Sequence, residues 1–103
     1  MKELDISRDI ISDIKVFEKV KFEKLEKLDL EENEISNIDI LENVNFKELK
    51  ELNLSYNEIS NIKVLEKNKF EKMEKLDLRW NEIDKNKFSS LIKILKSKFQ
   101  FKI

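Results

Sequence analysis

One column of side chains, repeated at a constant interval along the chain, offers most of the binding chemistry in this sequence. It consists of Arg8, Glu32, Tyr56 and Trp80, with Arg79 beside the last. The chain has one Tyr and one Trp, and both fall in this column. Tyr, Trp and Arg concentrate binding energy because they desolvate large areas while keeping a polar group. The column predicts a contact surface for another protein or peptide. The alternative is that the rings only cover aliphatic stems at a sheet edge.

Two further columns carry charge at the same spacing. One alternates in sign through Glu3, Lys27, Glu51 and Lys75. If these residues sit on adjacent strands about 4.8 Å apart, they attract one another and form a self-neutralising surface. The other column is Asp5, Asp29, Asn53 and Asp77. Its acids would repel across strands unless a lysine or a cationic partner group compensates. We include these residues in the predicted contact surface: Asp29, Asn53, Asp77, Glu51 and Lys75.

The chain lacks most of the residue types that catalytic and cofactor sites use. Cys, His, Gly and Pro are all absent, which excludes zinc sites, thiol nucleophiles, imidazole acid-base chemistry and glycine phosphate loops. Ser7 and Ser55 are expected to face outward, without a base at a motif spacing. A calcium ion on the acidic column would need about six to eight oxygen ligands, and these are not visibly arranged. We therefore expect no enzyme activity, no cofactor and no metal.

Length and charge limit the remaining classes of protein. The chain has 103 residues, enough for one domain, and 21 basic against 22 acidic residues give a net charge of -1. This balance argues against nucleic acid or a membrane as the main partner. The sequence has no apolar run of membrane-spanning length and no signal-peptide core at its start, and it lacks cysteine, so we expect a cytoplasmic location. The biased composition fits an AT-rich genome or a designed, consensus-like sequence.

The columns belong to an internal repeat. LEKLDLEENEIS from Leu25 aligns with LKELNLSYNEIS from Leu49 and MEKLDLRWNEID from Met73, and MKELDISRDIIS begins the chain. Four units of equal length span residues 1–24, 25–48, 49–72 and 73–96, and such a period is typical of a solenoid. Leu28 and Leu30 are two residues apart, which places them on one face of a strand but on opposite faces of a helix. This spacing excludes a coiled coil.

The second half of each unit returns the chain to the next strand. Turn-forming pairs such as Ser36-Asn37 precede Ile38, Ile40 and Leu41, a pattern that indicates a short helix or a 3₁₀ turn. One strand and one return per unit predict a parallel sheet wound as a right-handed coil.

The pattern L-x-x-L-x-L-x-x-N-x-I-x-x-I, read three times from Leu25, Leu49 and Met73, resembles the leucine-rich repeat. It looks most like the internalin-type branch with two residues added, and it covers essentially the whole chain. The resemblance implies an α/β solenoid, a short horseshoe arc with four to five parallel strands on the concave face and short helices or 3₁₀ turns on the convex side. It also implies a structural ladder formed by Asn33, Asn57 and Asn81, whose amides can pair buried turn groups.

The two ends depart from the repeat. In the first unit Asp9 replaces the ladder asparagine, and Ile10 replaces a glutamate. No cap precedes this unit, so its edge predicts self-association through Leu4, Ile6 and Ile10. At the other end, helical spacing predicts an amphipathic helix at about 87–97, and alternating apolar residues predict a closing strand at about 98–103. The helix is read as a cap or as core, with a membrane-surface role as the alternative.

Two functions from different classes follow. The first is a non-enzymatic module that binds a protein or peptide on its concave strand face, the use most associated with the leucine-rich repeat family. The second is a structural or self-assembling element, designed or a fragment, that homodimerises through its uncapped N-terminal repeat. Capping separates them, because a binding module normally protects both ends of its coil.

Overall fold

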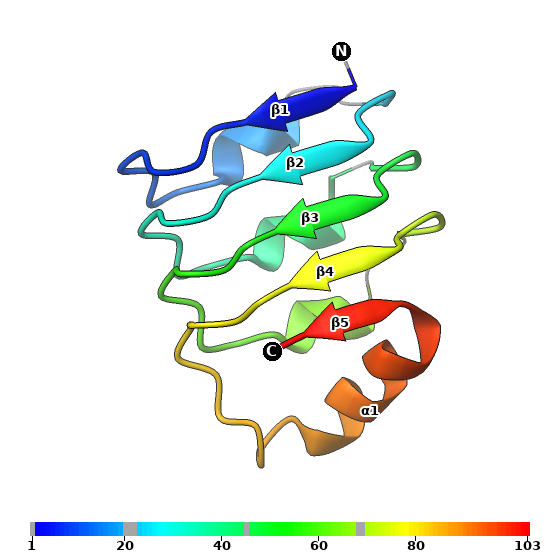
Figure 1. Cartoon of the computed structure of the whole chain (residues 1–103). Helices are drawn as coiled ribbons and strands as arrows, with labels where there is room; N and C mark the ends of the chain where they lie inside the picture. The colour runs from blue at the N-terminus through cyan, green and yellow to red at the C-terminus, as the bar shows by residue number, and fades with distance from the viewer. Residues whose placement is uncertain (1, 20–22, 45, 68–69) are drawn as a thin grey trace.

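The computed structural model is a coil with one parallel β-sheet along one side (Figure 1), and it describes residues 2–19, 23–44, 46–67 and 70–103. The five strands follow one another in sheet order and are β1 (Glu3–Asp5), β2 (Lys27–Asp29), β3 (Glu51–Asn53), β4 (Lys75–Asp77) and β5 (Gln100–Lys102). The first four pair through equivalent positions of successive units. The parallel sheet predicted from the repeat is therefore confirmed. Met1, the first position of the first unit, lies outside the described residues.

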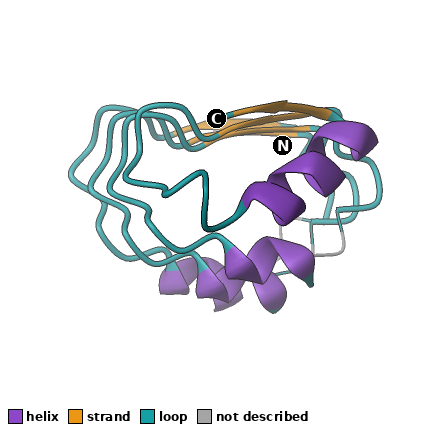
Figure 2. Ribbon diagram, turned by 90° about the horizontal axis from the view of Figure 1, so that it is seen from below, coloured by secondary structure: helices purple, strands orange, loops and turns teal. Residues whose placement is uncertain are grey.

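The returning segments lie on the side of the coil opposite the sheet (Figure 2). They are the 3₁₀ helices η1 (Lys15–Lys19), η2 (Asp39–Glu42) and η3 (Lys63–Glu66). Turn residues precede them: Asn37 Oδ1 accepts the N–H of Asp39 at 2.8 Å, and Asn61 Oδ1 accepts that of Lys63 at 3.0 Å. These bonds fix the entry to each short helix, because a side-chain oxygen two residues back stabilises such a turn.

The fourth unit returns through α1 (Ser89–Lys98), which leads into β5. The sequence places a helix at about 87–97 and a strand at about 98–103. Leu91, Ile92 and Leu95 of α1 are buried in the core. In both figures α1 lies across the C-terminal end of the coil, so the last apolar layer is covered there.

The core fills the space between the sheet and the returns. Each strand contributes its middle residue to the core, and the segment after each strand contributes further apolar residues. In the third unit these are Leu52 of the strand and Leu54 and Ile59 after it, all of which are buried. The same repeat positions are buried in the second and fourth units, at Leu28, Leu30, Leu76 and Leu78. At the N-terminal end the equivalent Leu4 and Ile6 are only partly buried, because β1 is an outer strand of the sheet.

Candidate protein-interaction surface

The strand face carries a ladder of ion pairs across four strands. Lys27 Nζ lies 3.4 Å from Glu3 and 3.0 Å from Glu51, and Lys75 Nζ lies 3.6 Å from Glu51 on the other side. Alternation in sign at a constant register produces this arrangement, as the sequence predicts. Exposed pairs of this kind contribute about 0 to 1 kcal/mol each. The ladder therefore neutralises the surface and adds little stability.

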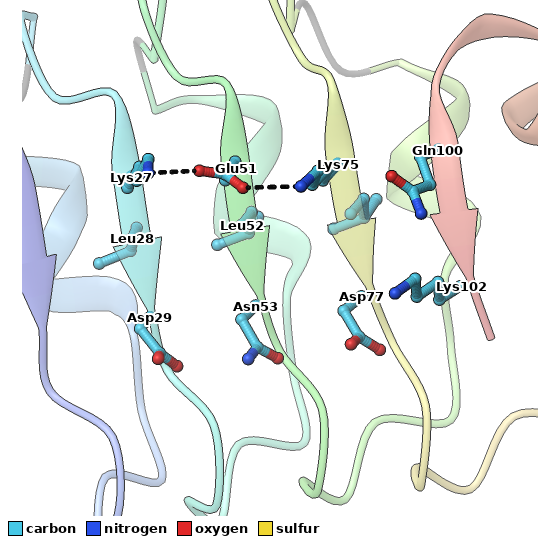
Figure 3. Close-up of a pocket in the computed structure, with 11 residues that line it drawn as sticks. Lys27, Leu28, Asp29, Glu51, Leu52, Asn53, Lys75, Asp77, Gln100 and Lys102 are labelled. Atoms are coloured by element: carbon cyan, nitrogen blue, oxygen red, sulfur yellow. Dashed lines mark ion pairs between the residues drawn. The ribbon is translucent and has the colours of Figure 1, made fainter.

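The same face is hollowed over its C-terminal strands. A depression of about 270 Å³ extends from β2 to β5, and Figure 3 shows the side chains that line it. Glu51 is paired with Lys27 and Lys75 there, while Gln100 and Lys102 of β5 reach toward β4. The depression is open and mixed in charge. It can accept a polar chain segment, and it offers no enclosed, water-poor site for general acid-base chemistry.

The acidic column ends each strand and turns the backbone. Asp29 Oδ1 accepts the N–H of Glu31 at 3.0 Å, Asn53 Oδ1 accepts that of Ser55 at 3.0 Å, and Asp5 and Asp77 make the same bond two residues on. A carboxylate or amide in this position stabilises a tight turn. These side chains therefore stabilise the turn after each strand. The sequence predicted only mutual repulsion between the acids of this column.

The aromatic column lies in the turns, beyond the strands. Arg8, Glu32, Tyr56 and Trp80 stand three residues after each strand ends, and all four have positive φ, between 54° and 61°. Our placement of these residues on the strand face is wrong, because each β-strand ends after three residues and the following turn, closed by a side-chain hydrogen bond, redirects the chain. The prediction that Ser7 and Ser55 face outward is also wrong, because Ser55 is buried and Ser7 is half-buried.

The turns bring the two aromatic side chains together. Tyr56 and Trp80 stack with ring centroids 5.8 Å apart and an interplanar angle of 23°. They are 46% and 68% exposed. In the two earlier units, Arg8 Nε lies 3.6 Å from Glu32 Oε2. The turn edge thus has a charged half and an aromatic half, and we call the Tyr56–Trp80 pair the aromatic stack.

Arg79 connects the aromatic stack to the strand face. Its Nε and Nη2 donate to the carboxylate of Asp77 at 3.0 and 2.7 Å. Burial alone raises the pKa of Asp77, but the hydrogen bonds from the Arg79 side chain and backbone outweigh burial, so that the pKa lies below its usual value. The same pairing raises the pKa of Arg79. This pair is thus charged at neutral pH, and the hydrogen bonds to Asp77 hold the guanidinium at the end of β4, one residue before Trp80.

The ladder asparagines are hydrogen-bonded across neighbouring units. Asn57 Nδ2 donates to the carbonyls of Leu30, Leu54 and Ser55 at 3.0 to 3.2 Å, and its Oδ1 accepts the N–H of Ile35 at 3.0 Å. Asn33 and Asn81 make the equivalent bonds in their own units. The amide group is suited to this position because it donates and accepts at once. These residues are occupied by the backbone and are not free for a ligand.

The ion-pair ladder predicts a weak dependence of stability on acid pH. The hydrogen bond from Lys27 lowers the pKa of Glu51. Stability from this carboxylate is present above its unfolded-state pKa of about 4.3 and is lost as the pH falls through the lower folded-state pKa. The free energy of unfolding, measured with urea, should fall between pH 7 and pH 3. We expect this fall to be smaller in Glu51→Gln than in the wild type by less than about 1 kcal/mol. The exposed Glu58→Gln is the control, and an equal loss in both variants would contradict the assignment.

Comparison with known proteins identifies the repeats. A family model described as leucine-rich repeat matches residues 48–62 and 71–86. The crystal structure of an internalin (inlF) from Listeria monocytogenes matches the fold with a TM-score of 0.73 at 22% sequence identity. The match covers 100% of this chain and 30% of that one. The chain has the leucine-rich-repeat fold. The solenoid fold class predicted from the sequence is confirmed, and none of the curated proteins compared with the chain matches it.

The leucine-rich-repeat chain gathers its predicted site residues in two places. Glu51, Lys75, Asp29, Asn53 and Asp77 line the depression on the strand face. Tyr56, Trp80 and Arg79 lie together at the turn edge, and Arg8 and Glu32 lie further along that edge. Sequence reasoning missed Gln100 and Lys102, which complete the depression from β5. Their signal was available, because the predicted closing strand places them beside Lys75 and Asp77.

Two other properties concern the described part of the leucine-rich-repeat chain. It contains no cluster of three or more acidic side chains that could hold a metal ion. No helix in it has the length and apolar character needed to cross a membrane. The cytoplasmic location stays a prediction from the sequence.

Proposed function

We propose that this leucine-rich-repeat chain is a non-enzymatic module that binds a protein or peptide through the aromatic stack and the adjoining strand face. The exposed stack is the observation that carries the proposal. Tyr56 and Trp80 supply a flat apolar surface with polar edges, and Arg79, next to Trp80 in the sequence, adds a cation that is hydrogen-bonded to Asp77 at the edge of the depression. Such residue types dominate the energetics of protein interfaces.

The backbone supports this function. Tyr56 and Trp80 have φ of 56° and 61°, a region that costs non-glycine residues about 1 to 2 kcal/mol each. Glycine or asparagine would fit these turns at lower cost. Bulky aromatic side chains that stay exposed in such positions add no core packing in return. A contact made outside the molecule supplies a reason for them.

Removing the aromatic stack is the direct test of the proposal. We expect the double variant Tyr56→Ala with Trp80→Ala to lose at least about tenfold in affinity for a partner captured on the immobilised wild-type chain, because two anchors are truncated. Ile94→Ala is the matched control, since Ile94 is 52% exposed on α1, away from the strand face. Circular dichroism would show that both variants fold. Unchanged capture by the double variant would refute the proposal.

A second candidate function is self-assembly through the N-terminal unit. Ile10 is 81% exposed, and Leu4, Ile6 and Ile11 are only partly covered at this end of the core. The strand edge itself opposes pairing between two copies, because β1 carries only Glu3 and Asp5 on its outer face. Antiparallel pairing of two such strands would place acid opposite acid. Self-association would therefore use the apolar end and not the strand edge.

Self-association predicts a dimer that depends on concentration. Light scattering coupled to size-exclusion chromatography should give a mass that rises toward twice 12.5 kDa as the protein concentration increases. A charge introduced by Ile10→Glu should restore the monomer, because it would have to be buried in the contact. A monomer at every concentration would rule out this candidate and leave the binding module unaffected.

A further inference from the structure

A column of glutamates runs along the turn edge beside the aromatic stack. The turns that follow β1 to β4 lie one after another along this edge (Figure 1). The second, third and fourth units each contribute one exposed glutamate, at Glu34, Glu58 and Glu82, and we call these three residues the glutamate column. Backbone bonds hold their turns in register, because Glu58 donates its N–H to the Ile35 carbonyl and Glu82 donates to the Ile59 carbonyl, both at 2.9 Å.

The glutamate column and the aromatic stack share the outer side of the same turns. Asn57 lies between Tyr56 and Glu58, and its side chain is buried and bonded to backbone carbonyls. Both neighbours of Asn57 are exposed. In the fourth unit Glu82 likewise follows Trp80 after one ladder asparagine. An acid therefore stands two residues after each ring, on the same exposed edge.

Glu58 shows how this register gathers negative charge, because a unit of the coil lies on each side of it. Its neighbours in the column are Glu34 and Glu82. Adjacent strands of a sheet are about 4.8 Å apart, and like charges at such a spacing repel. No residue from 51 to 62 is basic, so the strand and turn of the third unit supply no cation. A cation brought by a partner would reduce this repulsion.

The arginines of the turn edge do not neutralise the glutamate column. Arg8 is paired with Glu32, and Arg79 Nη2 lies 2.7 Å from Asp77 Oδ2. Among the residues that the structure describes, no ion pair joins any member of the column to a lysine or an arginine. The negative charge beside the aromatic stack is therefore complementary to a basic partner.

Arginine suits both features of this edge. Its planar guanidinium pairs with a carboxylate through two N–H bonds and also stacks on aromatic faces. The rings of Tyr56 and Trp80 are 46% and 68% exposed. In an extended peptide, side chains two residues apart lie on one face, about 6.7 Å from each other. The long side chains of two such arginines can therefore reach glutamates of neighbouring turns.

We propose that the aromatic stack and the glutamate column together bind a segment of a partner protein in which arginine alternates with other residues. One guanidinium stacks on the exposed rings, and the others pair with Glu34 and Glu58. The inference rests on the proposed function, because it names the chemistry of the partner that the aromatic stack binds.

A synthetic peptide tests the inference directly. The probe is the blocked peptide RSRSR, titrated into the full chain at low salt, where exposed charges are least screened. Trp80 is the sole tryptophan, so its fluorescence reports on the stack. We expect saturable quenching, together with amide NMR shifts at Tyr56 and Glu58. The uncharged control peptide QSQSQ should bind at least about tenfold more weakly, because it forms no charge-assisted hydrogen bonds.

Matched variants separate the turn edge from the charge of the whole molecule. Glu34→Gln with Glu58→Gln should weaken binding of RSRSR at least about fivefold, because two of its ion pairs are lost. The control is Glu42→Gln with Glu66→Gln, which removes the same charge from two exposed glutamates on η2 and η3. These helices lie on the side of the coil opposite the sheet (Figure 2). The control should change binding less than about twofold.

The other outcomes would overturn the inference in distinguishable ways. Equal binding of the two peptides, or equal losses in the two double variants, would show that the glutamate column does not recognise arginine. NMR shifts confined to the strand face, at Asp29 and Glu51, would refute the turn edge but would leave the proposed binding function in place. A protein partner lost on removal of the aromatic stack, yet retained by Glu34→Gln with Glu58→Gln, would support that function alone.

Discussion

Replacing Asn57 with alanine lowers the free energy of unfolding by about 3 kcal/mol, because it leaves the buried N–H of Ile35 without a partner and removes the hydrogen bonds from the Asn57 amide to the buried carbonyls of Leu30 and Leu54. Urea unfolding at neutral pH would measure this loss. For a chain of this size it corresponds to a melting temperature lower by more than about 10 °C.

Asn61→Ala is the matched control for this result. Asn61 accepts one exposed N–H, from Lys63 at 3.0 Å, and the turn stays open to water. We expect a loss below about 1 kcal/mol. Equal losses in the two variants would show that the asparagine ladder contributes no more than any other side-chain turn.

Leu52→Ala is the second substitution with a large expected effect. Leu52 lies in the central strand β3 and is 2% exposed, so truncation leaves a cavity that neighbouring units cannot fill. We expect a loss of about 3 kcal/mol in the free energy of unfolding. Chemical denaturation followed by circular dichroism would measure it.

Leu4→Ala tests the same repeat position at the end of the coil. Leu4 pairs in register with Leu28 and is only partly buried, because β1 is an outer strand. Its truncation should cost about 1 kcal/mol, since water already reaches the site. A loss as large as that of Leu52→Ala would mean that the N-terminal end is covered in solution, which would support self-assembly.

The repeat made most of the fold predictable. Apolar residues two apart at Leu28 and Leu30 indicate a strand, and their recurrence at the same place in the next unit fixes a parallel register. The alternating charges of Lys27 and Glu51 were also readable, because that register places them side by side. These features depend on local spacing and on contacts between equivalent positions, both of which a repeated sequence states directly.

The turn could not be read in the same way. Positive φ at Tyr56 and Trp80 has no sequence signal, because glycine, the usual indicator of such a backbone, is absent from the chain. Asp29 was read as a surface acid, whereas its hydrogen bond to Glu31 ends the strand. The strand therefore ends earlier than side-chain alternation suggests, and this moves the aromatic stack from the strand face to the turn edge.

The net charge hides an asymmetry along the chain, because residues 85–103 contain six lysines and no acid. The net charge of -1 for the whole chain is therefore no guide to the charge of this basic C-terminal segment.

The ion-pair ladder restricts how such an array could grow by duplication. Signs alternate between adjacent units in two columns, at Glu3, Lys27 and Glu51 and again at Lys2, Glu26 and Lys50. Insertion of one copied unit would place like charges side by side in both columns. Insertion of two consecutive units would keep every neighbouring pair opposite in sign. These two charged columns therefore repeat every two units, whereas the backbone repeats every unit. Lengthening the array by an even number of units keeps the ion pairs between neighbouring strands.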